Sequence, residues 1–127
     1  MDNPQYVPGV CNIGPAEIAV RRKVGWIGAA STVFLGAMFV YSDIGGFWLL
    51  LLFFSSVISA VGFIQGIMHF CAAFGLRSVF NLGSEVGRTD TVTQAEFRAQ
   101  DREKAWQILA YSVLVGLSVT LTTYLVK

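Results

Sequence analysis

Hydrophobic residues fall in three long, nearly uninterrupted runs along this chain of 127 residues. The runs cover residues 24–41, 47–76 and 106–126, and none of them contains Asp, Glu, Lys or Arg. Each is long enough to cross the ~30 Å hydrocarbon core of a bilayer, which takes about 20 helical residues. Because a soluble surface helix keeps a polar face at 3.6-residue spacing, these uniform runs predict three transmembrane helices.

The polar stretches complete the prediction of an all-α, polytopic membrane protein. The chain divides into an N-terminal polar segment, a transmembrane hairpin, and a loop with a helix that continues into the third span, over residues 1–14, 15–83 and 84–127. Pro15 and Glu17 suit the first turn of a helix. Gly45 and Gly46 lie in the tight turn of the hairpin, and Gly83 suits the stop of its second helix.

The third span continues a stretch of strong helix formers. Thr93 with Glu96 has the spacing of a capping box, which predicts one helix over about 94–126, extended into the cytoplasm. Arg98 and Asp101 are spaced to pair on its surface. Two interpretations of its first three turns are open, a solvated helix end and a docking surface for a cytoplasmic partner.

Composition and charge place the chain in an inner membrane. Hydrophobic residues make up 54% and charged residues 13%, and no basic stripe indicates nucleic acid as a partner. Eight of the nine basic residues precede the first span or lie between the second and third, and the ninth is Lys127. The positive-inside rule therefore predicts a cytoplasmic N-terminus and an external C-terminus. We expect the N-terminus to be retained, because residues 1–13 lack the basic region of a signal peptide.

Small residues recur at four-residue spacing in each span, where they let helices approach closely in lipid. The glycines in these stripes are the candidate packing residues Gly28, Gly36, Gly62, Gly66 and Gly116. The stripes predict a compact bundle, formed within one chain or between chains.

Gln65 and His69 are the notable polar residues of the second run, where such residues are energetically unfavourable. His69 is the only histidine, and a continuous helix would place it on the packed face with Gly62 and Gly66. It would suit an axial ligand to haem or a chlorin, but a hydrogen-bonded interfacial side chain needs fewer assumptions, and we predict no cofactor.

Cys11 and Cys71 flank the hairpin on the predicted cytoplasmic side. A structural disulfide is not expected in a reducing compartment, and two thiols with one histidine do not complete a zinc site. The alternatives are a redox or persulfide-carrying pair and two inert thiols. We predict no metal site.

Residues 11–14, Cys-Asn-Ile-Gly, precede basic residues and a span, and Cys71 stands near the end of the hairpin. This opening resembles the YgaP-type transmembrane domains, small bacterial inner-membrane hairpins of which some are fused to sulfurtransferases. The resemblance covers about residues 10–76. It implies that Cys11 and Cys71 lie close together.

These patterns favour a small, non-catalytic membrane subunit over an enzyme, because no nucleophile–base pair or phosphate-binding loop is present in the sequence. We expect it to assemble with itself or with other membrane subunits in the lipid bilayer. The alternatives are a thiol or cofactor site built from Cys11, Cys71 and His69, and an oligomeric pore lined by Ser, Thr and Gln65.

Overall fold

The computed structural model describes residues 5–127. Its elements are, in chain order, α1 (Pro15–Tyr41), α2 (Phe47–Met68), α3 (Ala72–Arg77), β1 (Val79–Phe80), β2 (Asp90–Thr91) and α4 (Ala95–Val126). Helices α1, α2 and α4 are each long and apolar enough to cross a membrane. The predicted all-α fold with three candidate spans is therefore confirmed.

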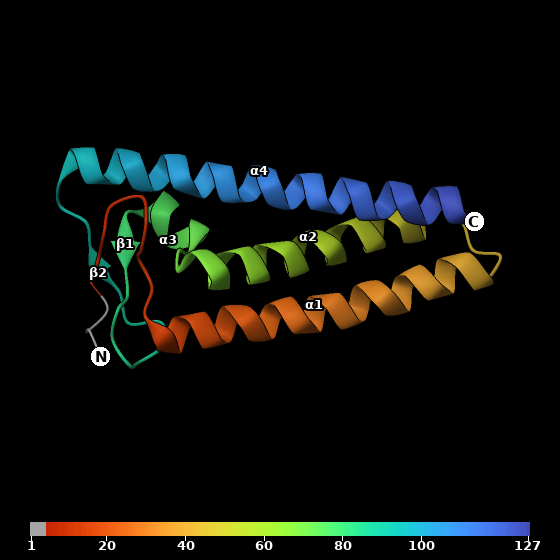
Figure 1. The fold of residues 1–127 in the computed structure, drawn as a ribbon, viewed down its shortest axis with the longest axis horizontal. Helices are drawn as coiled ribbons and strands as arrows, with labels where there is room; N and C mark the ends of the chain where they lie inside the picture. The colour runs from red at the N-terminus through yellow and green to blue at the C-terminus, as the bar shows by residue number, and fades with distance from the viewer. Residues whose placement is uncertain (1–4) are drawn as a thin grey trace.

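The three long helices run side by side, and the small elements gather at one end of them (Figure 1). The C-terminus lies at the opposite end, where Lys127 Nζ donates a hydrogen bond of 3.3 Å to the Ser42 carbonyl beside the α1–α2 turn. We call the unit at the N-terminal end the head. It comprises residues 5–14 and 69–94, together with the first two turns of α1 and the first three turns of α4.

Glycines bring the backbones of α1 and α2 into contact. A Cβ added to Gly62 would lie 2.5 Å from the Gly25 nitrogen, and one added to Gly28 would lie 2.8 Å from the Ser59 backbone. The Ser59 hydroxyl also donates to the Gly25 carbonyl at 2.8 Å. Close approach of this kind is how helices associate in lipid, so the hairpin is held by small residues within one chain.

The other candidate packing glycines differ in how closely they are covered. Gly116 faces Phe53 and Val57, which places the middle of α4 against α2. Gly66 lies under the Arg22 side chain, whereas the nearest atom to a Cβ on Gly36 would be a Leu52 methyl carbon at 3.9 Å. The packing is therefore tight near the head and looser toward the far end of α1.

The second helix ends earlier than the hydrophobic run predicted. α2 stops at Met68, and His69 takes the left-handed conformation with φ 57° and ψ 37° while its N–H caps the Gln65 carbonyl. The run stays apolar beyond this point because Phe70 and Ala72 pack in the head against Ala105 and Ile108 of α4. Burial against protein, and not against lipid, thus accounts for about the last quarter of the run.

Two further details differ from the prediction. The capping box at Thr93 does not form, since α4 begins after Gln94 with no side-chain cap. Gly83 is not the stop of the second helix, because the chain after α3 instead forms an antiparallel pair in which Val79 faces Thr91. The prediction of one continuous third helix is correct, with α4 running from Ala95 to Val126.

Candidate functional site

Asn12 fastens the N-terminal segment to the break between α2 and α3. Its side-chain amide donates to the Cys71 carbonyl at 3.1 Å and accepts from the Cys71 N–H at 2.6 Å. Its main chain donates to the His69 carbonyl and accepts from Asn81 N–H. Asn12 is fully buried. Its four hydrogen bonds therefore hold the N-terminal segment to residues 69–71 and to Asn81, and we call Asn12 the fastener of the head.

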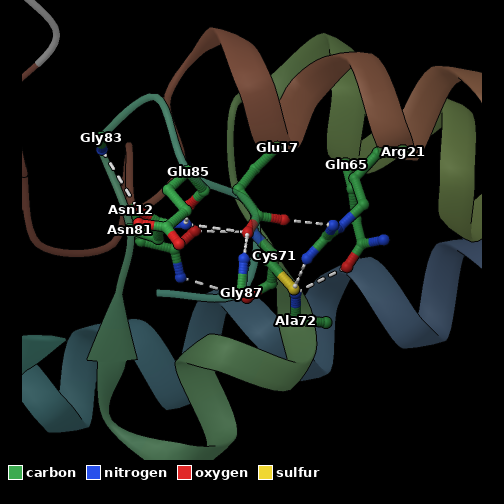
Figure 2. Close-up of polar contacts among 10 residues, drawn as sticks. All are labelled: Asn12, Glu17, Arg21, Gln65, Cys71, Ala72, Asn81, Gly83, Glu85 and Gly87. Carbon is green, nitrogen blue, oxygen red and sulfur yellow. Dashed lines mark hydrogen bonds and ion pairs between the residues drawn. The ribbon is translucent and has the colours of Figure 1, made fainter. Parts of the chain in front are cut away.

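Glu17 and Arg21 form an ion pair beside the same break (Figure 2). Arg21 Nη1 lies 2.5 Å from the Glu17 carboxylate, and Arg21 Nη2 donates to the Cys71 sulfur at 3.1 Å. The guanidinium also lies over the Phe74 ring, 5.3 Å from its centroid. Because α1 places Glu17 and Arg21 one turn apart, both side chains reach the head from the same helix face.

The loop between β1 and β2 closes over Glu17. Asn81 Nδ2 donates to a Glu17 carboxylate oxygen at 2.9 Å and to the Glu85 carbonyl at 2.8 Å, and the Gly87 N–H donates to Glu17 at 2.7 Å. Burial alone raises the pKa of the Glu17 carboxyl, but the bonds from Gly87 and Asn81 and the charge of Arg21 outweigh it and hold the pKa below its ordinary value. Glu17 is therefore a buried, ionised anchor.

Asp101 anchors the N-terminal segment to α4. Its carboxylate is fully buried and accepts bonds from the Tyr6 hydroxyl at 2.5 Å and the Gly9 N–H at 2.7 Å. The expected pairing with Arg98 does not form, because both carboxylate oxygens already have partners in the segment. Burial, with the hydrogen bond and charge of Asp101, raises the pKa of Tyr6 well above its usual range.

His69 does not lie on the packed face that the sequence predicted for it, and Gln65 lies within α2. His69 is exposed, because the helix ends there and turns the residue away from the packed face with Gly62 and Gly66. Gln65 is buried, and its side-chain oxygen accepts the Ala72 N–H at 2.8 Å. It satisfies one of the unpaired N–H groups at the start of α3.

Both cysteines are free thiols, and each makes a different contact. Cys11 is partly buried and its Sγ donates to the Ile13 carbonyl, while burial raises the pKa of its thiol. Cys71 is buried against Ile13 and Phe74 and receives the Arg21 bond. Within residues 5–127, no three His, Cys, Asp or Glu side chains gather as metal ligands.

The sequence prediction missed the residues that build this network. Asn12 and Asn81 received no contacts in it, Asp101 was expected to pair with Arg98, and Glu17 was assigned only to a helix start. A usable signal was present, since Asn12 and Asn81 each stand outside the predicted spans and two residues before a glycine. Their pairing depends on contacts between distant parts of the chain, which spacing alone does not reveal.

Comparison of the chain with protein-family profiles, with curated proteins and with solved structures finds no match. The function is therefore inferred from the geometry of the head and of the helices.

Proposed function

We propose that this protein is a small, non-catalytic subunit of the inner membrane that assembles with copies of itself or within a larger membrane complex. One observation carries the proposal: the buried polar side chains of the head hold the chain together. Asn12, Glu17, Asn81 and Asp101 each use their polar atoms in bonds within the protein. These bonds hold the head together as one structural unit.

We further propose that the head lies in the cytoplasm. Eight of the nine basic residues belong to the head or to the helix turns beside it, and only Lys127 lies at the other end. This asymmetry is the one that the positive-inside rule relates to cytoplasmic loops. The exposed first turns of α4, which carry Arg98 and Arg102, then face cytoplasmic partners.

Mass determination after purification in a mild detergent tests the assembly. We expect a mass above that of one chain, from further copies or from co-purifying subunits. A variant with Arg98→Glu and Arg102→Glu should lose partners that bind the head, whereas Arg88→Glu in the exposed loop should keep them. A stable lone monomer recovered from native membrane in several mild detergents would overturn the proposal.

A second candidate function is a thiol site at Cys71, with Cys11 one residue before Asn12, which bonds to the Cys71 main chain. The observation in its favour is the Arg21 guanidinium 3.1 Å from the Cys71 sulfur, since a neighbouring cation stabilises a thiolate. The double variant Cys11→Ser, Cys71→Ser tests it in cells. If cells that carry this variant behave like cells that carry the wild-type protein, the thiol function is eliminated. An absorbance spectrum of the purified protein would test a haem or chlorin at His69.

A further inference from the structure

A groove runs along the membrane-spanning part of the molecule between α1 and α4, with α2 as its floor. Near the middle of the bundle it encloses about 400 Å³. The lining residues there include Ala29 and Val33 of α1, Ala60 and Phe63 of α2, and Val115 and Val119 of α4. A second hollow of about 380 Å³ shares Val33 and Val119 and continues it to Tyr41 and Val126. We call the two together the α1–α4 groove.

Most of the hydroxyl groups along this groove already donate within the protein, so its lining favours an apolar occupant. Ser56 donates to the Leu52 carbonyl, and Ser59 donates to the Gly25 carbonyl. Thr32 donates to the Gly28 carbonyl and Thr123 to the Val119 carbonyl. Tyr41 and Thr122 lie at the far hollow, whereas in the headward hollow no hydroxyl hydrogen is left for a ligand, and a hydrocarbon chain needs none.

The depth of the headward hollow suits a single hydrocarbon chain. On α1 the headward hollow ends at Val33, about 14 Å from the start of the span at Val24 at 1.5 Å per residue, so it lies within the headward half of the ~30 Å hydrocarbon core. Toward the far end of the groove α1 and α4 converge (Figure 1), and Lys127 lies over the Phe39 ring at 4.3 Å. An acyl chain whose phosphate lies at Arg22 ends within the headward half and fills the hollow at Ala29 and Val33.

A cation stands at the headward end of the same face of α1. Arg22, Trp26, Ala29 and Val33 follow at spacings of four, three and four residues, which keeps them on one stripe. The Arg22 side chain is exposed and passes over Gly66, and among residues 5–127 it forms no ion pair. Trp26 packs edge-on against Phe63, which lines the groove, at 5.2 Å between ring centroids. Arg22 and Trp26 thus lie at the level where a lipid head group meets its acyl chains.

We propose that the α1–α4 groove binds one anionic phospholipid as a resident ligand, with an acyl chain between α1 and α4 and the phosphate at Arg22. The inference goes beyond the assembly proposed above and does not depend on it. It assigns a role to the side of the bundle where α1 and α4 separate.

Native mass spectrometry tests the proposal on the full chain, reconstituted in vesicles of equal phosphatidylcholine and phosphatidylglycerol and then extracted in mild detergent. We expect one retained phospholipid per chain, with about fivefold preference for phosphatidylglycerol, the factor for one surface Arg near an anionic lipid. Ala29→Phe fills the groove and should remove the lipid. Ala30→Phe, on the exposed neighbouring residue, is the matched control and should retain it.

Arg22→Gln should keep one lipid per chain but lose the head-group preference, and Arg88→Gln, in the exposed loop, is its control. If Ala29→Phe and Ala30→Phe retained equal amounts of lipid, the groove would not be the binding site of the acyl chain. If Arg22→Gln kept the preference for phosphatidylglycerol, the phosphate would not lie at Arg22. A lipid-free dimer that Ala29→Phe alone disrupts would show that a second copy occupies the groove, and would also overturn the proposal. The same spectra give the number of chains separately, so failure of assembly and failure of lipid binding are distinguishable.

A fluorescence measurement does not depend on the fold of the groove variants. With Trp48→Phe and Trp106→Phe, Trp26 is the remaining indole. Brominated acyl chains of phosphatidylglycerol should then quench Trp26 more strongly than those of phosphatidylcholine at equal concentration. Equal quenching by the two lipids would contradict a selective site.

Discussion

Replacing Asn12 by alanine removes both hydrogen bonds that its side chain makes with the Cys71 main chain. Cys71 is only 3% exposed, so its N–H and C=O would remain buried without partners. An unsatisfied buried group costs about 1–3 kcal/mol, and two of them cost about 2–6 kcal/mol. Native domains are stable by only about 5–15 kcal/mol, so Asn12→Ala should loosen or detach the head.

Two measurements check this expectation in detergent micelles. The thermal unfolding midpoint should fall by about 8–24 °C, at roughly 4 °C per kcal/mol for a chain of this size. In a Cys11→Ser background, Cys71 is the remaining thiol, and its labelling by a maleimide should become faster in Asn12→Ala because the head opens more often.

Gln107→Ala provides the control, because Gln107 is exposed on α4 and such substitutions usually change stability by less than about 0.5 kcal/mol. If Asn12→Ala matched Gln107→Ala in both the midpoint and the labelling rate, the assignment of Asn12 as the fastener of the head would be refuted.

Three further predictions concern the helices and the other anchors. Gly62→Ala should lower the unfolding midpoint, because its Cβ would meet α1 backbone, whereas Gly36→Ala should leave it unchanged or raised; equal effects would contradict the packing. The lowered pKa of Glu17 contributes stability that is present above its unfolded value of about 4.5 and is lost as pH falls through the folded value. Glu17→Gln should therefore flatten the acid side of the stability–pH profile, and a profile as steep as that of the wild type would count against it. Asp101→Asn weakens the hold on Tyr6, so hydrogen exchange in residues 5–14 should accelerate, and protection equal to wild type would exclude this anchor.

The sequence predicted the three membrane helices well, because an apolar run of 18 or more residues without charges is typical of a bilayer-spanning helix. It failed at residues 69–77, where the same apolar character has a different cause. Phe70 and Phe74 are buried in the head against other parts of the protein, and a hydropathy pattern does not distinguish burial in protein from burial in lipid. The exposed position of His69 follows from that one misplaced helix end.

The polar network was beyond prediction for a related reason. Asn12 bonds to Cys71 across 59 positions and Gly9 to Asp101 across 92. Local spacing indicates partners within a helix, as it did for Arg98 and Asp101, but Asp101 instead binds Tyr6 because burial makes that contact stronger than a surface pair. Only the folded chain shows which distant groups satisfy one another.

The position of Asn12 so far from its partners has a consequence for synthesis. At about 5–20 residues per second, the 59 positions that separate Asn12 from Cys71 take about 3–12 s to translate. During that interval the N-terminal segment has nothing to bind, while α1 and α2 are being inserted. The head closes only after the hairpin is made, so a chain whose hairpin fails to insert keeps its first residues open to cellular proteases for as long as the failure lasts.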